Sequence, residues 1–168
     1  QALVITDAEQ FAYNNELCNS SKSNTIVAYN NSYKLNFKYL GTKKTEDWEL
    51  CSVIVDDKLN LTFGFPASPI INIIKTDKYY ILEYVAGGVM QYQFEIYDMN
   101  GKKVYSEKDC TILFGNSYVE DGIYNYNSFT EIDDQHDRLY HRTIDLNKDV
   151  LKSESDIDYI IDKLPQSS

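Results

Sequence analysis

Alternation of apolar and polar residues is the feature that most constrains how this chain of 168 residues can fold. Residues 33–39, 59–65 and 91–96 each carry an apolar side chain at every second position, with a polar or small residue between. Successive side chains of a strand point to opposite faces, so each segment predicts a strand with one buried and one solvated face. That pattern is typical of antiparallel sheets. The run 70–74 is more apolar and predicts a central strand.

Turn-forming residues separate these segments. Asn100-Gly101 is the strongest signal, because a type I′ hairpin turn needs two successive residues that tolerate a positive φ. The 15 Tyr and 7 Phe favour sheets, whereas 7 Gly and 3 Pro are too few for a loop-rich chain. We therefore predict a mainly β protein, an antiparallel meander of about ten strands. The other turn signals are Asn30-Asn31, Asp56-Asp57-Lys58, Ala86-Gly87-Gly88, Glu120-Asp121-Gly122 and Asn147-Lys148-Asp149.

Similar hairpin sequences indicate an internal repeat. Residues 94–104 (FEIYDMNGKKV) and 142–150 (RTIDLNKDV) both contain Asp-[Met/Leu]-Asn followed by Val, and 53–59 (VIVDDKL) is a degenerate third copy. Their spacing of roughly 40 to 50 residues is in the range of a four-stranded propeller blade. This favours small packed propeller-like sheets. A barrel or sandwich stays open as the alternative, because hairpin turns look alike in any meander.

A helix is expected at each end of the chain. Thr6 and Glu9 match a capping box and predict a helix over 7–18. Ser155 can cap a second helix over 156–164, in which four apolar residues recur at helical spacing: Ile157, Ile160, Ile161 and Leu164. We expect one domain over 1–168, with a β-sheet core over 24–152.

The charge of the chain restricts its partners. Its 26 acidic and 16 basic residues give a net charge of −10. A nucleic-acid binder needs a basic face, and an anionic membrane repels acidic surfaces, so we expect neither partner. We expect a cationic protein instead. No apolar run is long enough to span a membrane.

The negative charge is concentrated after residue 118, where 12 acidic and 5 basic residues give −7. Its densest part, 131–137, lies between predicted strands 123–131 and 138–145 and is expected to be a hairpin tip. We interpret this tip as a plug for a basic cleft, flanked by aromatic anchors. The alternative is a solvated loop that keeps the protein soluble. The residues assigned to partner binding are Asp133, Asp134, His136, Asp137, Tyr124, Tyr126, Tyr140, Glu120 and Asp121.

Catalytic and metal-binding motifs are not found in the sequence. The only histidines, His136 and His141, lie near three acidic residues, but their spacing matches neither an EF-hand loop nor a zinc motif. The sequence contains no nucleophile elbow, phosphate-binding glycine loop or Cys-x-x-Cys pair. We predict a non-enzymatic protein without a cofactor.

The three cysteines, Cys18, Cys51 and Cys110, allow one disulfide or none. A Cys18–Cys51 bond is our candidate, because it would attach the predicted N-terminal helix to the sheet. Buried free thiols are the alternative. The chain starts at Gln1, and we expect a leader to have been removed, which would place the protein in the periplasm or outside the cell.

A small, acidic, β-rich chain with hairpins such as 97–102 (YDMNGK) and without a catalytic motif resembles periplasmic immunity proteins. These are the partners of peptidoglycan-degrading effectors of type VI secretion, and propeller-like members are the nearest form. Periplasmic lysozyme inhibitors are functionally similar. The resemblance covers the architecture of 24–152 and implies a protein that occludes the active cleft of a cell-wall hydrolase. The alternatives are a lipocalin-like small-ligand carrier and a structural surface lipoprotein domain.

Overall fold

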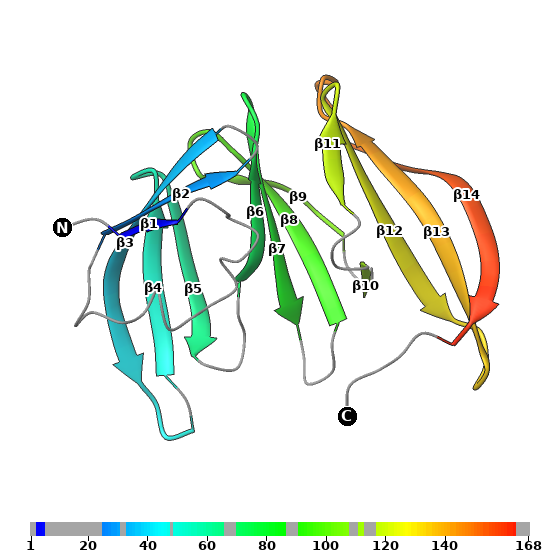
Figure 1. Cartoon of the computed structure of the whole chain (residues 1–168), viewed down its shortest axis with the longest axis horizontal. Coiled ribbons are helices and arrows are strands. Elements are labelled where there is room, and N and C mark those ends of the chain that lie inside the picture. The colour runs from blue at the N-terminus through cyan, green and yellow to red at the C-terminus, as the bar shows by residue number, and fades with distance from the viewer. Residues whose placement is uncertain are drawn as a thin grey trace.

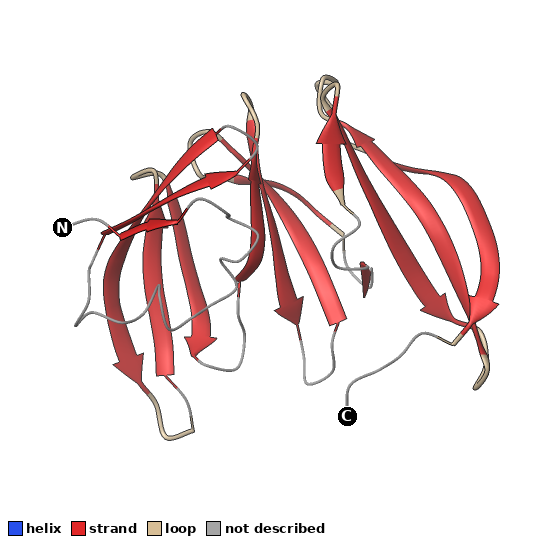
Figure 2. Cartoon of the chain, viewed as in Figure 1, coloured by secondary structure: helices blue, strands red, loops and turns tan. Residues whose placement is uncertain are grey.

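The computed structural model describes residues 3–5, 25–30, 33–47, 49–65, 70–86, 91–107, 111–112 and 117–163 (Figure 1). These residues contain fourteen strands rather than about ten, and no helix occurs among them (Figure 2). No stretch of the described residues forms a helix suited to crossing a bilayer. The strands are β1 (Leu3–Ile5), β2 (Thr25–Asn30), β3 (Tyr33–Lys44), β4 (Glu49–Val55), β5 (Leu59–Phe65), β6 (Ile70–Lys75), β7 (Tyr79–Ala86), β8 (Gln91–Asp98), β9 (Lys103–Ser106), β10 (Thr111–Ile112), β11 (Tyr118–Glu120), β12 (Ile123–Glu131), β13 (His136–Asp145) and β14 (Ser153–Asp162).

The strands form three antiparallel units that lie side by side in Figure 1. The first unit is β2–β5, with β1 added in parallel to β2. The second unit is β6–β9, and the third is β11–β14. The two-residue strand β10 pairs with both β8 and β12, so the second and third units join into one nine-stranded sheet. The mainly β prediction is therefore confirmed.

A hydrophobic core lies between the first and second units, and another lies between the second and third. The second unit contributes to both, because neighbouring side chains of β6 and β7 point to opposite faces. Ile73 lies in the first core and Ile74 in the second, and Tyr80 and Ile81 divide in the same way. The apolar run at β6 thus reflects burial on both faces, although β6 ends the hydrogen-bonded order of its sheet.

The predicted alternation is confirmed in the first unit. Leu35 and Phe37 of β3 are buried, whereas Lys34, Asn36 and Lys38 between and beside them are exposed. The remaining buried members of the first core are Cys51, Val53, Val55, Leu59, Leu61, Tyr80 and Leu82. Those of the second core are Ile81, Phe94, Ile96, Tyr124, Tyr126, Ile144 and Leu146.

The three similar hairpin sequences occupy equivalent places. Each connects the third strand of a unit to the fourth, at β4–β5, β8–β9 and β13–β14. Asp98 and Asp145 have the same local role, because each side chain accepts a hydrogen bond from the backbone N–H two residues later, at 2.8 Å and 2.9 Å. In these two hairpins the sequence similarity therefore follows from a shared turn chemistry. The β4–β5 turn differs, because Asp56 accepts from the N–H of Asn36 instead.

The predicted C-terminal helix over 156–164 is wrong. Residues 153–162 are the strand β14, which pairs with β13 along its length. Ile157, Tyr159 and Ile161 also recur with period two, so the apolar spacing alone could not separate helix from strand. The ladder with β13 decides between them. The predicted helix over 7–18 lies outside the described residues.

The expected type I′ turn at Asn100-Gly101 is also wrong. Gly101 has a φ of 83°, but Asn100 does not have a positive φ. The N–H of Gly101 donates to the carbonyl of Asp98 at 3.0 Å, and the register with β9 shifts between Ile96 and Tyr97. Two successive positive φ angles occur instead at Asp56-Asp57 (54° and 57°) and Asp121-Gly122 (54° and 76°).

Gly101→Ala is expected to lower the free energy of unfolding by about 1–3 kcal/mol. A Cβ at this position would overlap the backbone oxygen of Lys58 in the β4–β5 turn, and φ is unfavourable for alanine. Urea unfolding followed by tyrosine fluorescence measures the change. Asn100→Ala in the same turn is the control and should change stability by under about 0.5 kcal/mol. Equal stability of both variants would contradict the close contact between the two turns.

Candidate functional site

The acidic hairpin tip joins β12 and β13, and Glu131 pairs with Asp137 at its base. The Asp133 carboxylate accepts hydrogen bonds from the backbone N–H groups of Gln135 (2.8 Å) and His136 (2.7 Å). The bond from Gln135, followed by those from His136, holds the pKa of Asp133 below its usual value. The tip is therefore a preformed turn that carries negative charge at neutral pH.

Asp137 does not belong to the surface of this tip. Its side chain is 1% exposed, and its Oδ1 lies 3.4 Å from Nζ of Lys163. Lys163 also contacts Glu131 at 2.6 Å, and its backbone N–H donates to the carbonyl of Gln135 at 2.8 Å. The hydrogen bond to Glu131, with the charge of Asp137, raises the pKa of Lys163. Asp137 therefore fastens the end of β14 to the hairpin. Of the four tip residues assigned to partner binding, Asp133, Asp134 and the half-buried His136 are accessible.

The aromatic anchors expected beside the tip are mostly elsewhere. Tyr124 and Tyr126 are 0% exposed and belong to the second core, so they cannot touch a partner. Tyr140 is half-buried, and the guanidinium of Arg142 lies 5.0 Å from its ring centroid. The prediction for Tyr124 and Tyr126 fails because tyrosine suits a core as well as a surface whenever its hydroxyl finds a partner.

Glu120 and Asp121 lie at the opposite end of β12 from the acidic tip (Figure 1). The strand between them spans nine residues. At about 3.3 Å per residue this separates the two acidic groups by roughly 26 Å. The structure therefore does not bring them together into one surface.

Cys51 is completely buried and disulfide-bonded. This overturns the alternative of a free thiol at Cys51. Cys18 and Cys110 lie outside the described residues, so the Cys18–Cys51 pairing stays a prediction.

A buried carboxylate that the sequence analysis missed connects the second and third units. Glu83 of β7 is 1% exposed and accepts hydrogen bonds from the hydroxyls of Tyr124 and Ser117, each at 2.5 Å. Burial, followed by the charge of Glu83, raises the pKa of Tyr124 well above its usual value. The signal was a single acid in the apolar run 79–86. These two hydrogen bonds tie Glu83 of β7 to the third unit.

Glu107, which is half-buried, is a second carboxylate that binds tyrosine hydroxyls. Its Oε1 accepts hydrogen bonds from the hydroxyls of Tyr105 (2.6 Å) and Tyr126 (2.8 Å). The rings of Tyr124 and Tyr126 stack with centroids 5.1 Å apart, and Phe94 packs against both. Two carboxylates therefore fix the hydroxyl ends of one aromatic cluster.

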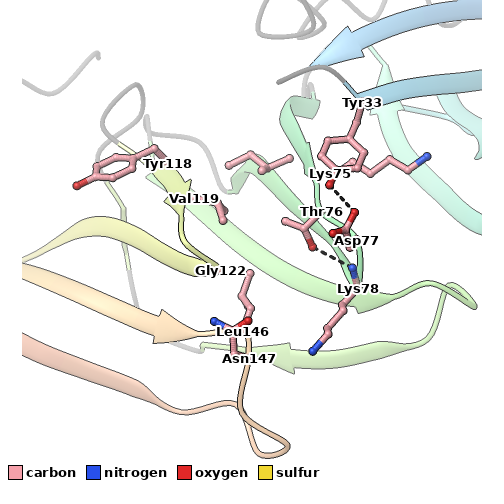
Figure 3. A pocket seen from close by; sticks show the side chains of 11 residues that line it. Tyr33, Lys75, Thr76, Asp77, Lys78, Tyr118, Val119, Gly122, Leu146 and Asn147 are labelled. Carbon is pink, nitrogen blue, oxygen red and sulfur yellow. Dashed lines mark hydrogen bonds between the residues drawn. The ribbon is translucent and has the colours of Figure 1, made fainter.

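A hollow of about 450 Å³ lies among the turns that follow β6, β11 and β13 (Figure 3). The β11–β12 turn is at the end of β12 opposite the acidic tip (Figure 1). All three units contribute to the wall of the hollow. Tyr33 donates a hydrogen bond to Asp77 at 2.5 Å, and this bond raises the pKa of Tyr33. Tyr118 and Asn147, from the third unit, line another side of the hollow. The sequence analysis missed this site, whose one signal was the turn-forming stretch 76–78 (Thr-Asp-Lys).

Asp56 fixes Lys75, one of the residues of this hollow. Its Oδ2 accepts hydrogen bonds from Nζ of Lys75 (2.8 Å) and the hydroxyl of Tyr80 (2.6 Å), and Oδ1 accepts from the N–H of Asn36 (2.9 Å). Burial by itself would raise the pKa of Asp56, but these hydrogen bonds outweigh it and leave the pKa below its usual value. The first and second units are therefore tied together by an ionised carboxylate.

Comparisons of the chain with protein-family models, curated proteins and solved structures give no match. Within the described residues, no group of three His, Cys, Asp or Glu side chains is placed to hold a metal ion.

Asp56→Asn is expected to lower the free energy of unfolding at pH 7 by about 2 kcal/mol, because the hydrogen bonds from Lys75 and Tyr80 lose their charged acceptor. The pKa of Asp56 is lowered in the folded state, so its contribution is complete above the ordinary value of 3.8 and disappears as the pH falls through the folded-state value. The difference between wild type and variant should therefore shrink in acid. Urea titrations from pH 7 to pH 2 measure it.

Asp57→Asn is the matched control for this experiment. Asp57 belongs to the same turn and also has a positive φ, but its side chain is exposed. We expect it to cost under about 0.5 kcal/mol at every pH. An Asp56→Asn effect that is constant with pH would argue against the ionised carboxylate.

Proposed function

We propose that this protein is a non-enzymatic inhibitor of the immunity-protein type, which binds a cationic peptidoglycan-degrading enzyme and occludes its active cleft. The observation that carries the proposal is the charged tip of the β12–β13 hairpin, at which Asp133 and Asp134 are exposed and Glu131, also exposed, pairs with Lys163. Asp162 extends this acidic surface, because it pairs with His136 at the start of β13. A basic rim around an enzyme cleft would attract such a surface and speed association.

The form of the tip suits insertion into a cleft. Two strands of nine and ten residues support it, and the hydrogen bonds from Gln135 and His136 to Asp133 fix its turn. A preformed turn loses little conformational entropy on binding. This combination of reach, rigidity and charge supports an occluding role more directly than the solvated-loop alternative does.

A location in the periplasm or outside the cell is part of the proposal. The disulfide at Cys51 supports it, because such bonds persist in oxidising compartments. Three antiparallel units, with a hairpin at an equivalent place in each, also support the propeller-like form over a barrel. The resemblance to immunity proteins rests on that form.

The variant Asp133→Asn/Asp134→Asn is expected to weaken binding of the target enzyme by about tenfold at low salt and by less at high salt. Asparagine keeps the acceptor that forms the turn, so the change removes charge without removing the turn. The target is identified by capture from an extracytoplasmic extract and mass spectrometry. Release of soluble fragments from purified peptidoglycan then measures its inhibition.

The matched control is Glu120→Gln/Asp121→Asn, which removes the same charge at the opposite end of β12. It should bind and inhibit like the wild type. If both double variants bind equally well, the tip is not the binding surface. If the captured protein has no activity on peptidoglycan, the proposed target class is wrong.

The hollow supports a second candidate function, the binding of a small ligand. Its volume of about 450 Å³ is in the range of ligand sites, and Tyr33, Lys78 and Tyr118 line it with aromatic and charged groups. If this function holds, native mass spectrometry of the purified protein should show a bound ligand that Tyr118→Ala/Lys78→Ala loses. The Asp133→Asn/Asp134→Asn variant should retain it, and an unliganded mass for the wild type would contradict this function.

A further inference from the structure

We propose that the outer edge of β14 receives an extended basic segment of the partner as an additional β-strand. The inference rests on the proposed function, since it names how the cationic partner binds beside the acidic tip. It is nevertheless a separate physical claim about the backbone of β14.

The first observation is the position of β14 in the sheet. It ends the order of the nine-stranded sheet, and among the described strands it pairs with β13 alone. Residues 157–162 keep a regular register with 136–141, and the irregularity of the ladder lies beyond them, between His141 and Arg142. An edge strand of this kind offers a row of N–H and carbonyl groups to a further strand.

The second observation is the apolar surface of this edge. Ile157, Tyr159 and Ile160 are 54%, 49% and 59% exposed. In the regular part of the strand, Ile157 and Tyr159 lie on one face, whereas Ile160 lies on the other. Three large exposed apolar side chains within four residues favour a surface that another chain covers.

The third observation is charge. The strand carries four exposed acids, Glu154, Asp156, Asp158 and Asp162, and no Lys or Arg. Acids on an edge strand repel a second copy of the same strand, because like charges opposite each other destabilise a sheet. They leave the edge open to a strand that carries basic residues. Asp158 and Asp162 share the face of Ile160, so the matching strand alternates basic residues on that face with branched apolar residues on the other.

The experiment uses a synthetic peptide, acetyl-Lys-Val-Lys-Ile-Lys-Val-Lys-amide, and isothermal titration calorimetry of the full chain. We expect it to bind the wild type, whereas Asp158→Lys/Asp162→Lys should lose at least about tenfold in affinity. The same variant should gain affinity for the peptide in which glutamate replaces every lysine. The control is Asp47→Lys/Asp149→Lys, which makes the same charge change at exposed positions outside β14. It should bind the lysine peptide more tightly than Asp158→Lys/Asp162→Lys does.

N-methylation of the peptide separates strand addition from simple charge attraction. Methyl groups on alternate residues block one edge of the peptide, and methyl groups on the other residues block the opposite edge. Strand addition predicts that one methylation pattern abolishes binding, whereas the other leaves the affinity unchanged. The side chains changed on β14 are exposed, so the variants should unfold like the wild type, and circular dichroism checks this.

Several results would overturn the inference. They are a peptide that does not bind, equal affinity of both double-lysine variants, equal effects of both methylation patterns, and a wild-type dimer in sedimentation that the β14 variant lacks. The proposed function fails separately. If the target enzyme binds the β14 variant normally but loses the tip variant, strand addition is wrong and the inhibitor proposal stands. If the peptide binds as expected but no peptidoglycan-degrading target is captured, strand addition at β14 stands and the inhibitor proposal is wrong.

Discussion

Burial of both faces of the second unit is the constraint on which the rest of the molecule depends. The first and third units each supply one apolar face, and β6 and β7 supply a surface for both. Neither outer unit could bury its face without this middle layer, since a small isolated sheet is marginal in water. The high tyrosine content also has its reason here. Asp56 accepts a hydrogen bond from the hydroxyl of Tyr80, and Glu83 accepts one from the hydroxyl of Tyr124. In each core a tyrosine therefore buries its apolar ring and also provides a hydrogen-bond donor to a carboxylate.

The sequence predicted those parts of the fold that local patterns determine. Alternation located the buried face of β3, and the strand over 123–131 has the bounds that its pattern predicted. The turn residues also marked the equivalent position in each of the three units. In each case the side-chain period and the turn chemistry act over a few residues, so the sequence contains the necessary information.

The errors came from positions that tertiary contacts decide. The apolar residues of 156–164 fit a helix, but pairing with β13 makes most of this segment a strand. Tyr124 and Tyr126 looked like surface anchors because an adjacent acidic loop suggested an interface, and a distant carboxylate holds each of them in the core. The hollow combines residues from all three units, so a local motif such as the turn at 76–78 could indicate only a part of it. Disulfide pairing also depends on contacts between distant segments, so the sequence alone does not determine it.

The two-residue strand β10 has a mechanical consequence. The third unit is internally strong, with nine registered pairs between β12 and β13 and nine between β13 and β14. Among the residues that the structure describes, its ladder connection to the second unit consists of three registered pairs, at Thr111 and Ile112. A pulling force applied through β14 would therefore spread across the third unit and concentrate at this seam. The aromatic packing and the tyrosine–carboxylate bonds behind the seam, rather than the backbone ladder, would bear the load.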